Sequence, residues 1–376
     1  MNNKTEQVEM LPVVLDMPQS VCFKRKRNTI LLILFILLSL SKCINASCSL
    51  RDGDKVTSIV IPLSGTMSIS NDMATKDLTS IIIGRSLRKV RCTTSNPFYG
   101  EIRHSGTEVF TYFFDKYYKT NFDGIGFYFA QENAKIPNTL YPIKECLSSD
   151  DKSICADQSM NFNLLKYGNV KPGILYGSSI PVIKTYVGQS DSMVLLNQIN
   201  FSGSITFTLP TCKTPDVIVE MDSHPSSEFT GKGSTTAWKN ANIILSDCGV
   251  FNGYGTSVSY RSDLSISSGH PSNTIRNNNL GLSITPLNGV IDRSKGIMAI
   301  SPTPGSARGI GIQLGYGDTN SAESDLIDFA TIRTHILPKD GTKTISIPIS
   351  ARYIQTEDNI KPGKADGKLT FMITYK

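Results

Sequence analysis

The sequence has few of the residues, and none of the motifs, on which most enzymes depend. Its 376 residues include four histidines, and these are scattered without the spacing of metal ligands. No G-x-S-x-G, H-E-x-x-H or Walker sequence occurs, and no close C-x₂-C pair is present. Nothing points to acid–base chemistry by carboxylates. We therefore expect a protein that is not an enzyme and that carries no metal or other cofactor.

The chain also lacks a strong charge of either sign. It carries a net charge of +6, from 38 Lys and Arg against 32 Asp and Glu. The first 46 residues hold six Lys and Arg and three Asp and Glu, so the remainder has 32 against 29, or +3. An excess this small is typical of a soluble surface and not of a nucleic-acid-binding one. We expect no nucleic-acid partner.

The sequence has no apolar run of the length needed to cross a bilayer as a helix, which is about 20 residues. The run Ile30–Leu40 is eleven residues long and follows the basic sequence KRKR at 24–27. A basic flank, a short apolar core and a small residue after it are typical of a secretory signal. We assign residues 1–46 to a signal peptide cleaved after Ala46. We also hypothesise that translation starts at Met17, which would give a signal of ordinary length.

Six cysteines remain after this cleavage. An even number of cysteines in an exported chain indicates disulfides formed in an oxidising compartment. Six cysteines can be joined into three disulfides in 15 ways, and order along the chain with the domain division given below favours one set of three bonds. These are Cys48–Cys92, Cys146–Cys155 and Cys212–Cys248.

Composition and periodicity together predict an all-β fold with two sandwich domains. Long amphipathic helical periods are scarce, and short apolar runs recur between turn residues. We expect a jelly-roll or immunoglobulin-like sandwich over residues 47–197 and an immunoglobulin-like sandwich over 198–376. The polar run at 196–201 is the expected linker between them.

The chain ends in a segment with a clear period of two. Within Gly363–Lys376, the apolar residues Leu369, Phe371 and Ile373 alternate with Lys368, Thr370, Met372 and Thr374. This pattern predicts a strand with one buried face. A strand this apolar at the edge of a sheet must be covered by something, and no sequence follows it.

The C-terminal half, from about residue 200 to 376, resembles the pilin domains of bacterial chaperone–usher fimbriae. In that family the last strand has a glycine fourteen residues from the end, alternating apolar residues and a penultimate tyrosine. The sequence matches at Gly363, Leu369, Phe371, Ile373 and Tyr375. It also matches at the cysteines of LPTC (209–212) and IILSDC (243–248), and at GIGIQLGYGD (309–318) and ISARYIQTEDNIKPG (349–363).

The resemblance implies an immunoglobulin-like sandwich that lacks its last strand. A periplasmic chaperone would first fill the resulting groove, and the N-terminal strand of an adjacent fimbrial subunit would then replace it at the outer-membrane usher. The expected groove residues are Gly363, Leu369, Phe371, Ile373, Tyr375 and Lys376, whose carboxylate the chaperone would hold. In the family, Cys212–Cys248 matches the pilin disulfide. Cys48–Cys92 resembles the bond near the N-terminus of two-domain tip adhesins.

The resemblance also suggests a position in the fibre. After cleavage only Ser47 precedes Cys48, so we expect a chain that accepts a donor strand and gives none. Together with the extra N-terminal domain, this predicts a tip adhesin, exported through the periplasm to the fimbrium tip at the cell surface. It would bind a host or surface ligand, with a glycan or glycoprotein receptor as the expected class. The competing hypotheses are a structural tip or adaptor subunit without a ligand, and a secreted enzyme with a sandwich domain.

The sequence suggests a small set of ligand-binding residues in the N-terminal half. Tyr128 lies in an aromatic-rich strand, and an aromatic face can pack against a sugar ring. Polar residues after that strand could donate and accept hydrogen bonds: Gln131, Glu132, Asn133 and Asn138. The competing interpretation is that the aromatic residues belong to the core and that the polar ones form a solvated turn.

Overall fold

The computed structural model describes most of the chain after the predicted signal peptide. The described residues are 48–51, 53–83, 89–92, 98–112, 115–131, 140–143, 153–155, 160–260 and 275–376. The signal peptide predicted over 1–46 and the start predicted at Met17 lie outside them. Within the described residues, no helix has the length and apolar character needed to cross a membrane.

Strands form nearly all of the regular structure, as the composition predicts. Those of the first 208 residues are β1 (Cys48–Leu50), β2 (Thr57–Leu63), β3 (Thr66–Ser68), β4 (Lys76–Asp77), β5 (Thr79–Ile83), β6 (Lys89–Cys92), β7 (Phe98–Arg103), β8 (Glu108–Tyr112), β9 (Asp115–Lys119), β10 (Ile125–Gln131), β11 (Tyr141–Ile143), β12 (Ser153–Cys155), β13 (Met160–Lys166), β14 (Gly173–Tyr176), β15 (Ile183–Gln189) and β16 (Ser192–Thr208). A 3-10 helix, η1 (Gly177–Ser179), precedes β15.

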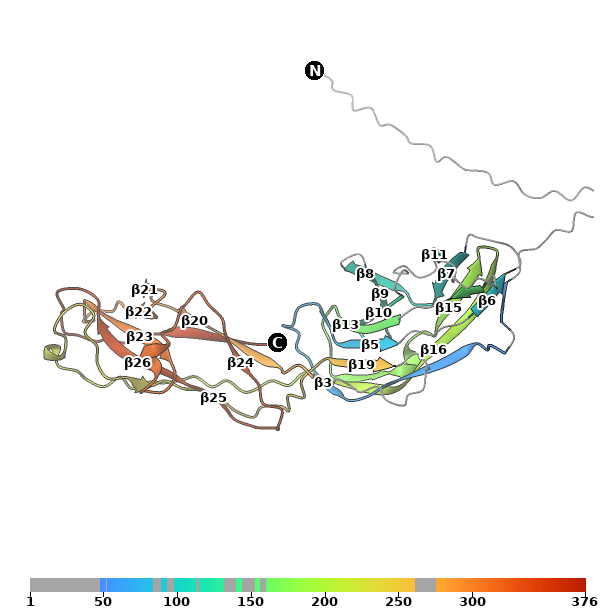
Figure 1. The fold of residues 1–376 in the computed structure, drawn as a ribbon. Coiled ribbons are helices and arrows are strands. Elements are labelled where there is room, and N and C mark those ends of the chain that lie inside the picture. The colour runs from blue at the N-terminus through green and yellow to red at the C-terminus, as the bar shows by residue number, and fades with distance from the viewer. Residues whose placement is uncertain are drawn as a thin grey trace, which may run out of the picture. The chain divides into compact units, whose positions relative to one another are not determined.

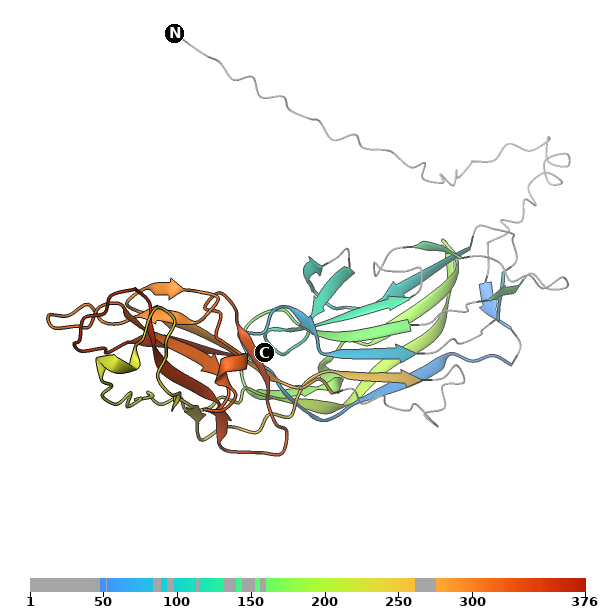
Figure 2. The same cartoon turned by 60° about the vertical axis from the view of Figure 1, so that its left-hand side comes forward.

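The remaining strands belong to the C-terminal part of the chain. They are β17 (Lys239–Asn240), β18 (Ile243–Leu245), β19 (Thr256–Tyr260), β20 (Asn279–Pro286), β21 (Val290–Asp292), β22 (Ile297–Ala299), β23 (Ile310–Tyr316), β24 (Arg333–Ile336), β25 (Ile345–Ile347), β26 (Ile349–Gln355) and β27 (Leu369–Tyr375). The short 3-10 helices η2 (Ser226–Glu228) and η3 (Ala322–Ser324) lie in its loops. The fold is therefore all-β (Figures 1 and 2).

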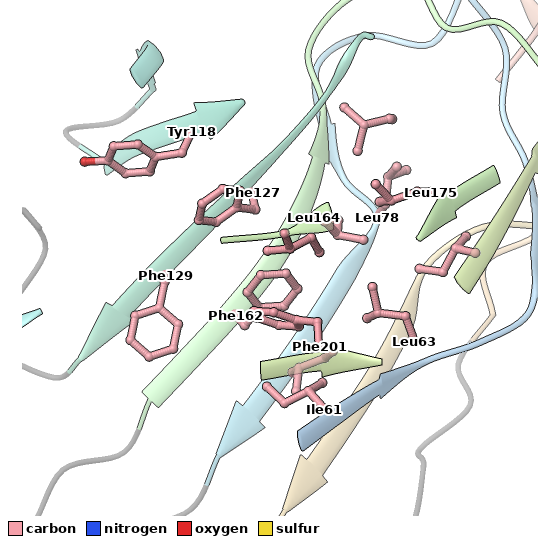
Figure 3. Close-up of a cluster of buried hydrophobic side chains, with 14 of the residues drawn as sticks. Ile61, Leu63, Leu78, Tyr118, Phe127, Phe129, Phe162, Leu164, Leu175 and Phe201 are labelled. Carbon is pink, nitrogen blue, oxygen red and sulfur yellow. The ribbon is translucent and has the colours of Figure 1, made fainter. Parts of the chain in front are cut away.

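Two sheets and the apolar core between them form the N-terminal sandwich. One sheet has the order β19-β5-β13-β10-β9-β8, and the other has the order β11-β7-β15-β16-β14, with β2 and β3 also paired to β16. Apolar side chains at alternate positions of both sheets point toward one another, as Figure 3 shows for Phe127, Phe162 and Phe201. This alternation is what a period of two produces when one face of each sheet is buried.

A small third sheet, β1-β6-β12, carries the first disulfide. Cys48 and Cys92 lie opposite each other in the antiparallel pair β1–β6, and a disulfide joins their side chains. Val90 and Phe98 are fully or almost fully buried beside this bond. This pairing is one of the three expected from the sequence.

The C-terminal sandwich has a separate core. Its sheets have the orders β17-β26-β23-β22-β21 and β24-β20-β27, with β18 and β25 forming a two-stranded pair. Leu280, Leu282 and Leu314 are among the buried residues between them. The Cys212–Cys248 disulfide, also an expected pair, lies against this core. Cys146, the expected partner of Cys155, lies outside the described residues.

The linker predicted near 196–201 is a strand in the structure. β16 runs without a break from Ser192 to Thr208, pairing with β15 at its start and with β14 at its end. The polar residues of the predicted linker fit this strand because the side chain of buried Asn197 donates to Thr185 Oγ1 at 2.9 Å, while Ile199 is fully buried. Leu209 still packs on the N-terminal core and Cys212 on the C-terminal one, so the chain changes sandwich between them.

β19 departs from the expected domain division. The sequence predicts Thr256–Tyr260 as a strand of the C-terminal sandwich. Instead, β19 pairs in parallel with β5, with Thr256 opposite Thr79 and Tyr260 opposite Ile83. In Figures 1 and 2 it is the orange strand beside the blue and green strands of the N-terminal sheet. Tyr254, just before β19, is also buried in the N-terminal core.

Candidate functional site

The last strand, β27, lies at the edge of its sheet. It pairs along its length with β20, and within the described residues no strand pairs with its other side. Leu369, Phe371 and Ile373 face the core but remain only half-buried, whereas Met372 on the opposite face is 58% exposed. The alternation predicted from the sequence is therefore present. The strand begins at Leu369 and not at Gly363.

An extended segment forms a second wall opposite β27. The sequence predicts a strand at Val217–Glu220, and these residues do alternate, with Val217 and Val219 half-buried against the core while Ile218 is 86% exposed. The backbone from Asp216 to Ser223 nevertheless makes no backbone–backbone hydrogen bond with any described residue. It has the shape of a strand without a strand partner.

A cavity of about 770 Å³ lies between these two walls. Leu369 and Phe371 of β27 line one side, and Val217, Val219 and Met221 line the other. The floor consists of apolar core residues from five strands and from the chain before β18: Ala241, Ile243, Ile284, Met298, Ile312, Leu314, Ile349 and Ala351. We call this cavity the groove. The sequence pattern identified β27 but not the floor, because floor residues come together only through long-range pairing.

The groove is closed at the Tyr375 end. The Tyr375 hydroxyl accepts a hydrogen bond from the Cys212 backbone N–H at 3.0 Å, and its ring lies 5.7 Å from the ring of Phe251 in a stacked arrangement. Burial raises the pKa of the Tyr375 hydroxyl, so it stays protonated across the physiological range. Lys376 pairs with Asn279 through two backbone hydrogen bonds of 2.6 and 2.7 Å. The open part of the groove therefore lies beside Leu369 and Phe371.

Gly363 is placed differently from the other expected groove residues. It is not among the residues that line the cavity. It lies where the chain before β27 passes against the backbone of Gly305 and Ser306, and a Cβ at position 363 would stand 2.4 Å from the Gly305 carbonyl oxygen. Its role in this structure is to allow that close approach, which holds the chain entering β27 in place.

The structure places the candidate ligand residues in different settings. Tyr128 lies on β10, where it is only 8% exposed and packs with Tyr117 and Leu165 on the face of the sheet away from the main core. Its ring is thus covered and does not offer an open platform for a sugar, which corrects that part of the expectation. Gln131 is the last residue of β10, opposite Met160. Glu132, Asn133 and Asn138 lie outside the described residues.

A comparison with models of protein families gives a match for the C-terminal part of the chain, which contains the groove. The family model described as Fimbrial protein matches residues 199–376. Residues 199–376 are a fimbrial domain. The match covers β27, both walls of the groove and its floor. It agrees with the expectation of a non-enzymatic protein, since the fimbrial domain is a structural module. No curated protein matches the chain at a significant level.

Solved structures similar to this chain include two adhesins and a complex that contains a tip adhesion subunit. The CupB6 tip adhesin from Pseudomonas aeruginosa is 14% identical, with a TM-score of 0.35 over 88% of this chain and 94% of that one. The receptor-binding domain of MrkD1P from Klebsiella pneumoniae is 14% identical, with a TM-score of 0.29 over 45% of this chain and 98% of that one. CsuC–CsuE, a chaperone–tip adhesion subunit complex from Acinetobacter baumannii, is 10% identical, with a TM-score of 0.22 over 87% of this chain and 99% of that one. Likenesses at this level carry no functional argument by themselves.

Proposed function

We propose that this protein is a fimbrial tip adhesin whose fimbrial domain joins the fibre by accepting a β-strand from another polypeptide in the groove. The observation that supports the proposal most directly concerns β27, which pairs with β20 on one side and, among the described residues, with no strand on the side next to the open apolar cavity. An unpaired apolar edge is a template for an added strand. The incoming strand would hydrogen-bond to β27 and cover Leu369 and Phe371.

The energetics of the groove favour an occupant. Apolar surface removed from water stabilises a complex by about 25 cal/mol per Å². An added strand would also give hydrogen-bond partners to the backbone of Asp216–Ser223, which has no backbone partner among the described residues. The partners we propose are a periplasmic chaperone during export, then an adjacent subunit placed at the outer-membrane usher. The match to the fimbrial family and the open groove support this proposal.

A peptide-addition experiment tests the strand-acceptor function. The mature chain is mixed with a synthetic peptide of about fifteen residues in which valine alternates with serine, or with a peptide of the same composition in scrambled order. The alternating peptide should raise the melting temperature of the fimbrial domain by several degrees, as expected for a ligand that binds only the folded state. It should also slow hydrogen exchange in β27. Equal behaviour of both peptides would contradict the proposal.

We further propose that the N-terminal sandwich binds the ligand, with a glycan as the class. This sandwich has its own core, and the groove lies outside it, so ligand binding and strand acceptance use separate parts of the chain. Gln131, Glu132, Asn133 and Asn138 remain the candidates, now without Tyr128. The location we propose is the fimbrium tip at the cell surface.

A glycan array probed with the mature chain, its groove filled by the alternating peptide, tests ligand binding. The full chain is used because a fragment cut at the predicted linker would lose part of β16 and all of β19. Alanine at Asn133 and Asn138 should weaken binding to any glycan found, while alanine at exposed Lys171 should leave it unchanged. Absence of binding to glycans, glycoproteins and cells would favour the structural tip or adaptor subunit.

A further inference from the structure

The outer edge of the groove has a distinctive charge. Along the wall Asp216–Ser223, residues 217, 219 and 221 face the core, and the residues between them are exposed. Three of the four exposed positions from 216 to 222 are carboxylates: Asp216, Glu220 and Asp222. The wall thus presents apolar side chains inward and acidic side chains outward.

Asp216 and Glu220 differ from the other acidic residues that line the groove. Asp222 forms an ion pair with Lys239, and Asp366 on the other side of the groove pairs with Lys364 at 3.4 Å. Within the described residues, neither Asp216 nor Glu220 has a side-chain hydrogen bond or ion pair. Lys368 is the one basic residue that lines the groove, against four acidic ones.

A strand added to this wall would lie beside those carboxylates. Neighbouring strands are about 4.8 Å apart, which brings directly opposed Cβ atoms to within about 5.5 Å of each other. At that distance opposite charges attract and like charges repel. The outward side chains of an occupant therefore determine whether the wall favours or opposes it, while its inward side chains fill the apolar cavity.

We propose that the groove selects an extended segment of another polypeptide that is apolar on its inward face and carries Lys or Arg on its outward face, beside Asp216 and Glu220. The inference rests on the proposed strand-acceptor function and adds the chemistry of the partner to it. The carboxylates act mainly on partner choice and on the rate of encounter, because exposed charge pairs contribute little to affinity and are screened by salt.

Matched peptides test this inference. Three peptides share one alternating set of inward valines and differ outward, where they carry lysine, glutamine or glutamate. Binding to the mature chain is measured by fluorescence anisotropy at about 50 mM and 500 mM NaCl, concentrations chosen to lie on either side of physiological screening. At low salt the lysine peptide should bind about five-fold more tightly than the glutamate peptide, and the difference should shrink at high salt.

Variants of the wall provide the control. The double variant D216N/E220Q should bind all three peptides equally. Glu357→Gln removes an exposed carboxylate that is not among the groove residues and should leave the lysine preference intact. Failure of every peptide to bind would overturn the strand-acceptor function itself. Equal binding of the three peptides, or a preference that survives in D216N/E220Q, would keep that function and overturn the charge selection.

Discussion

Gly363 shows how a single missing Cβ fixes the path of the chain. Lys364, the next residue, donates its N–H to the Gly305 carbonyl at 3.0 Å and accepts from the Ala307 N–H at 2.8 Å. This short parallel bridge brings two backbones so close that a side chain at position 363 would meet backbone atoms on three residues. The glycine that the family resemblance singled out therefore acts on the approach to β27 and not inside the groove.

Gly363→Ala should destabilise the fimbrial domain by about 1–3 kcal/mol, because the new Cβ must displace backbone and not a flexible side chain. Urea unfolding of the mature chain measures the loss. Gly168→Ala is the matched control, since a Cβ there would meet only the Gly124 Cα at an ordinary 3.5 Å. Similar stability of the two variants would show that the segment before β27 can relax around the methyl group.

His104 is a titratable residue in the N-terminal sandwich, and core side chains cover part of its ring. Its Nδ1 accepts the Gly106 N–H at 3.0 Å, and its ring lies edge-on to Tyr118 at 4.2 Å. Burial lowers the pKa of this imidazole from 6.5 to about 4. The unfolded chain therefore binds a proton over a pH range in which the folded chain does not, and folding stability is lost as the pH falls from 6.5 toward 4.

Above pH 6.5 this contribution of His104 to stability is fully present, and below about pH 4 the loss levels off. In the variant His104→Asn the asparagine side-chain oxygen can still accept the Gly106 N–H. The melting temperature of this variant should depend less on pH between 6.5 and about 4. His335→Asn is the corresponding variant in the C-terminal sandwich. The pKa of His335 is lowered mainly by burial and to a smaller extent by the charge of Arg333. An unchanged pH profile in His104→Asn would mean that other groups cause the dependence.

At the scale of single elements, periodicity predicted what is local and missed what is not. β27 was predictable because a strand with one buried face has an apolar residue at every second position, and this pattern is visible in the sequence. The polar run at 196–201 looked like a linker because Asn197, Gln198 and Asn200 are polar, although Asn197 is buried in a strand and its side-chain amide donates to Thr185. Tyr128 looked available for ligand binding because the sequence does not show whether an aromatic residue on the outer face of a sheet is exposed or covered.

The continuity of β16 predicts where an N-terminal fragment can end. Residues 198–208 place Ile199, Phe201, Ile205 and Phe207 in the core, and each buried side chain of this size contributes about 1.5–3 kcal/mol. A fragment of residues 47–197 should therefore fail to fold, whereas 47–211 should give a cooperative melting transition by circular dichroism. Cooperative folding of the shorter fragment would show that β16 can end at the predicted linker.

At the scale of the whole molecule, Ser68 joins segments that are far apart in sequence. Its buried hydroxyl lies 3.0 Å from Thr208 Oγ1, accepts the Asn252 N–H at 2.8 Å and donates to the Val250 carbonyl at 3.2 Å. Asn278 adds a hydrogen bond from its side chain to the Ser68 carbonyl at 2.8 Å. No local sequence signal marks such a residue, since its importance comes from partners 140 or more positions away.

Ser68→Ala should destabilise the protein by about 1–3 kcal/mol, because it leaves the partly buried Asn252 N–H without its acceptor and removes the bond to Thr208. Hydrogen exchange should accelerate at Asn252 and in β19 as well as in β3. Ser204→Ala, on a half-buried serine of β16 without a side-chain hydrogen bond among those described, should change stability by less than about 0.5 kcal/mol. If only β3 responded, the Ser68 contacts would not link the two stretches of chain.

The placement of β19 has a mechanical consequence for the joint between the two sandwiches. The chain passes from the N-terminal to the C-terminal sandwich after β16, returns to form β19, and passes back to reach β20. A pull that separates the two sandwiches would therefore be shared among three covalent crossings and would not fall on a single tether. Separating the two sandwiches would require β19 to be stripped from β5, so the joint should resist stretching as part of the fold itself.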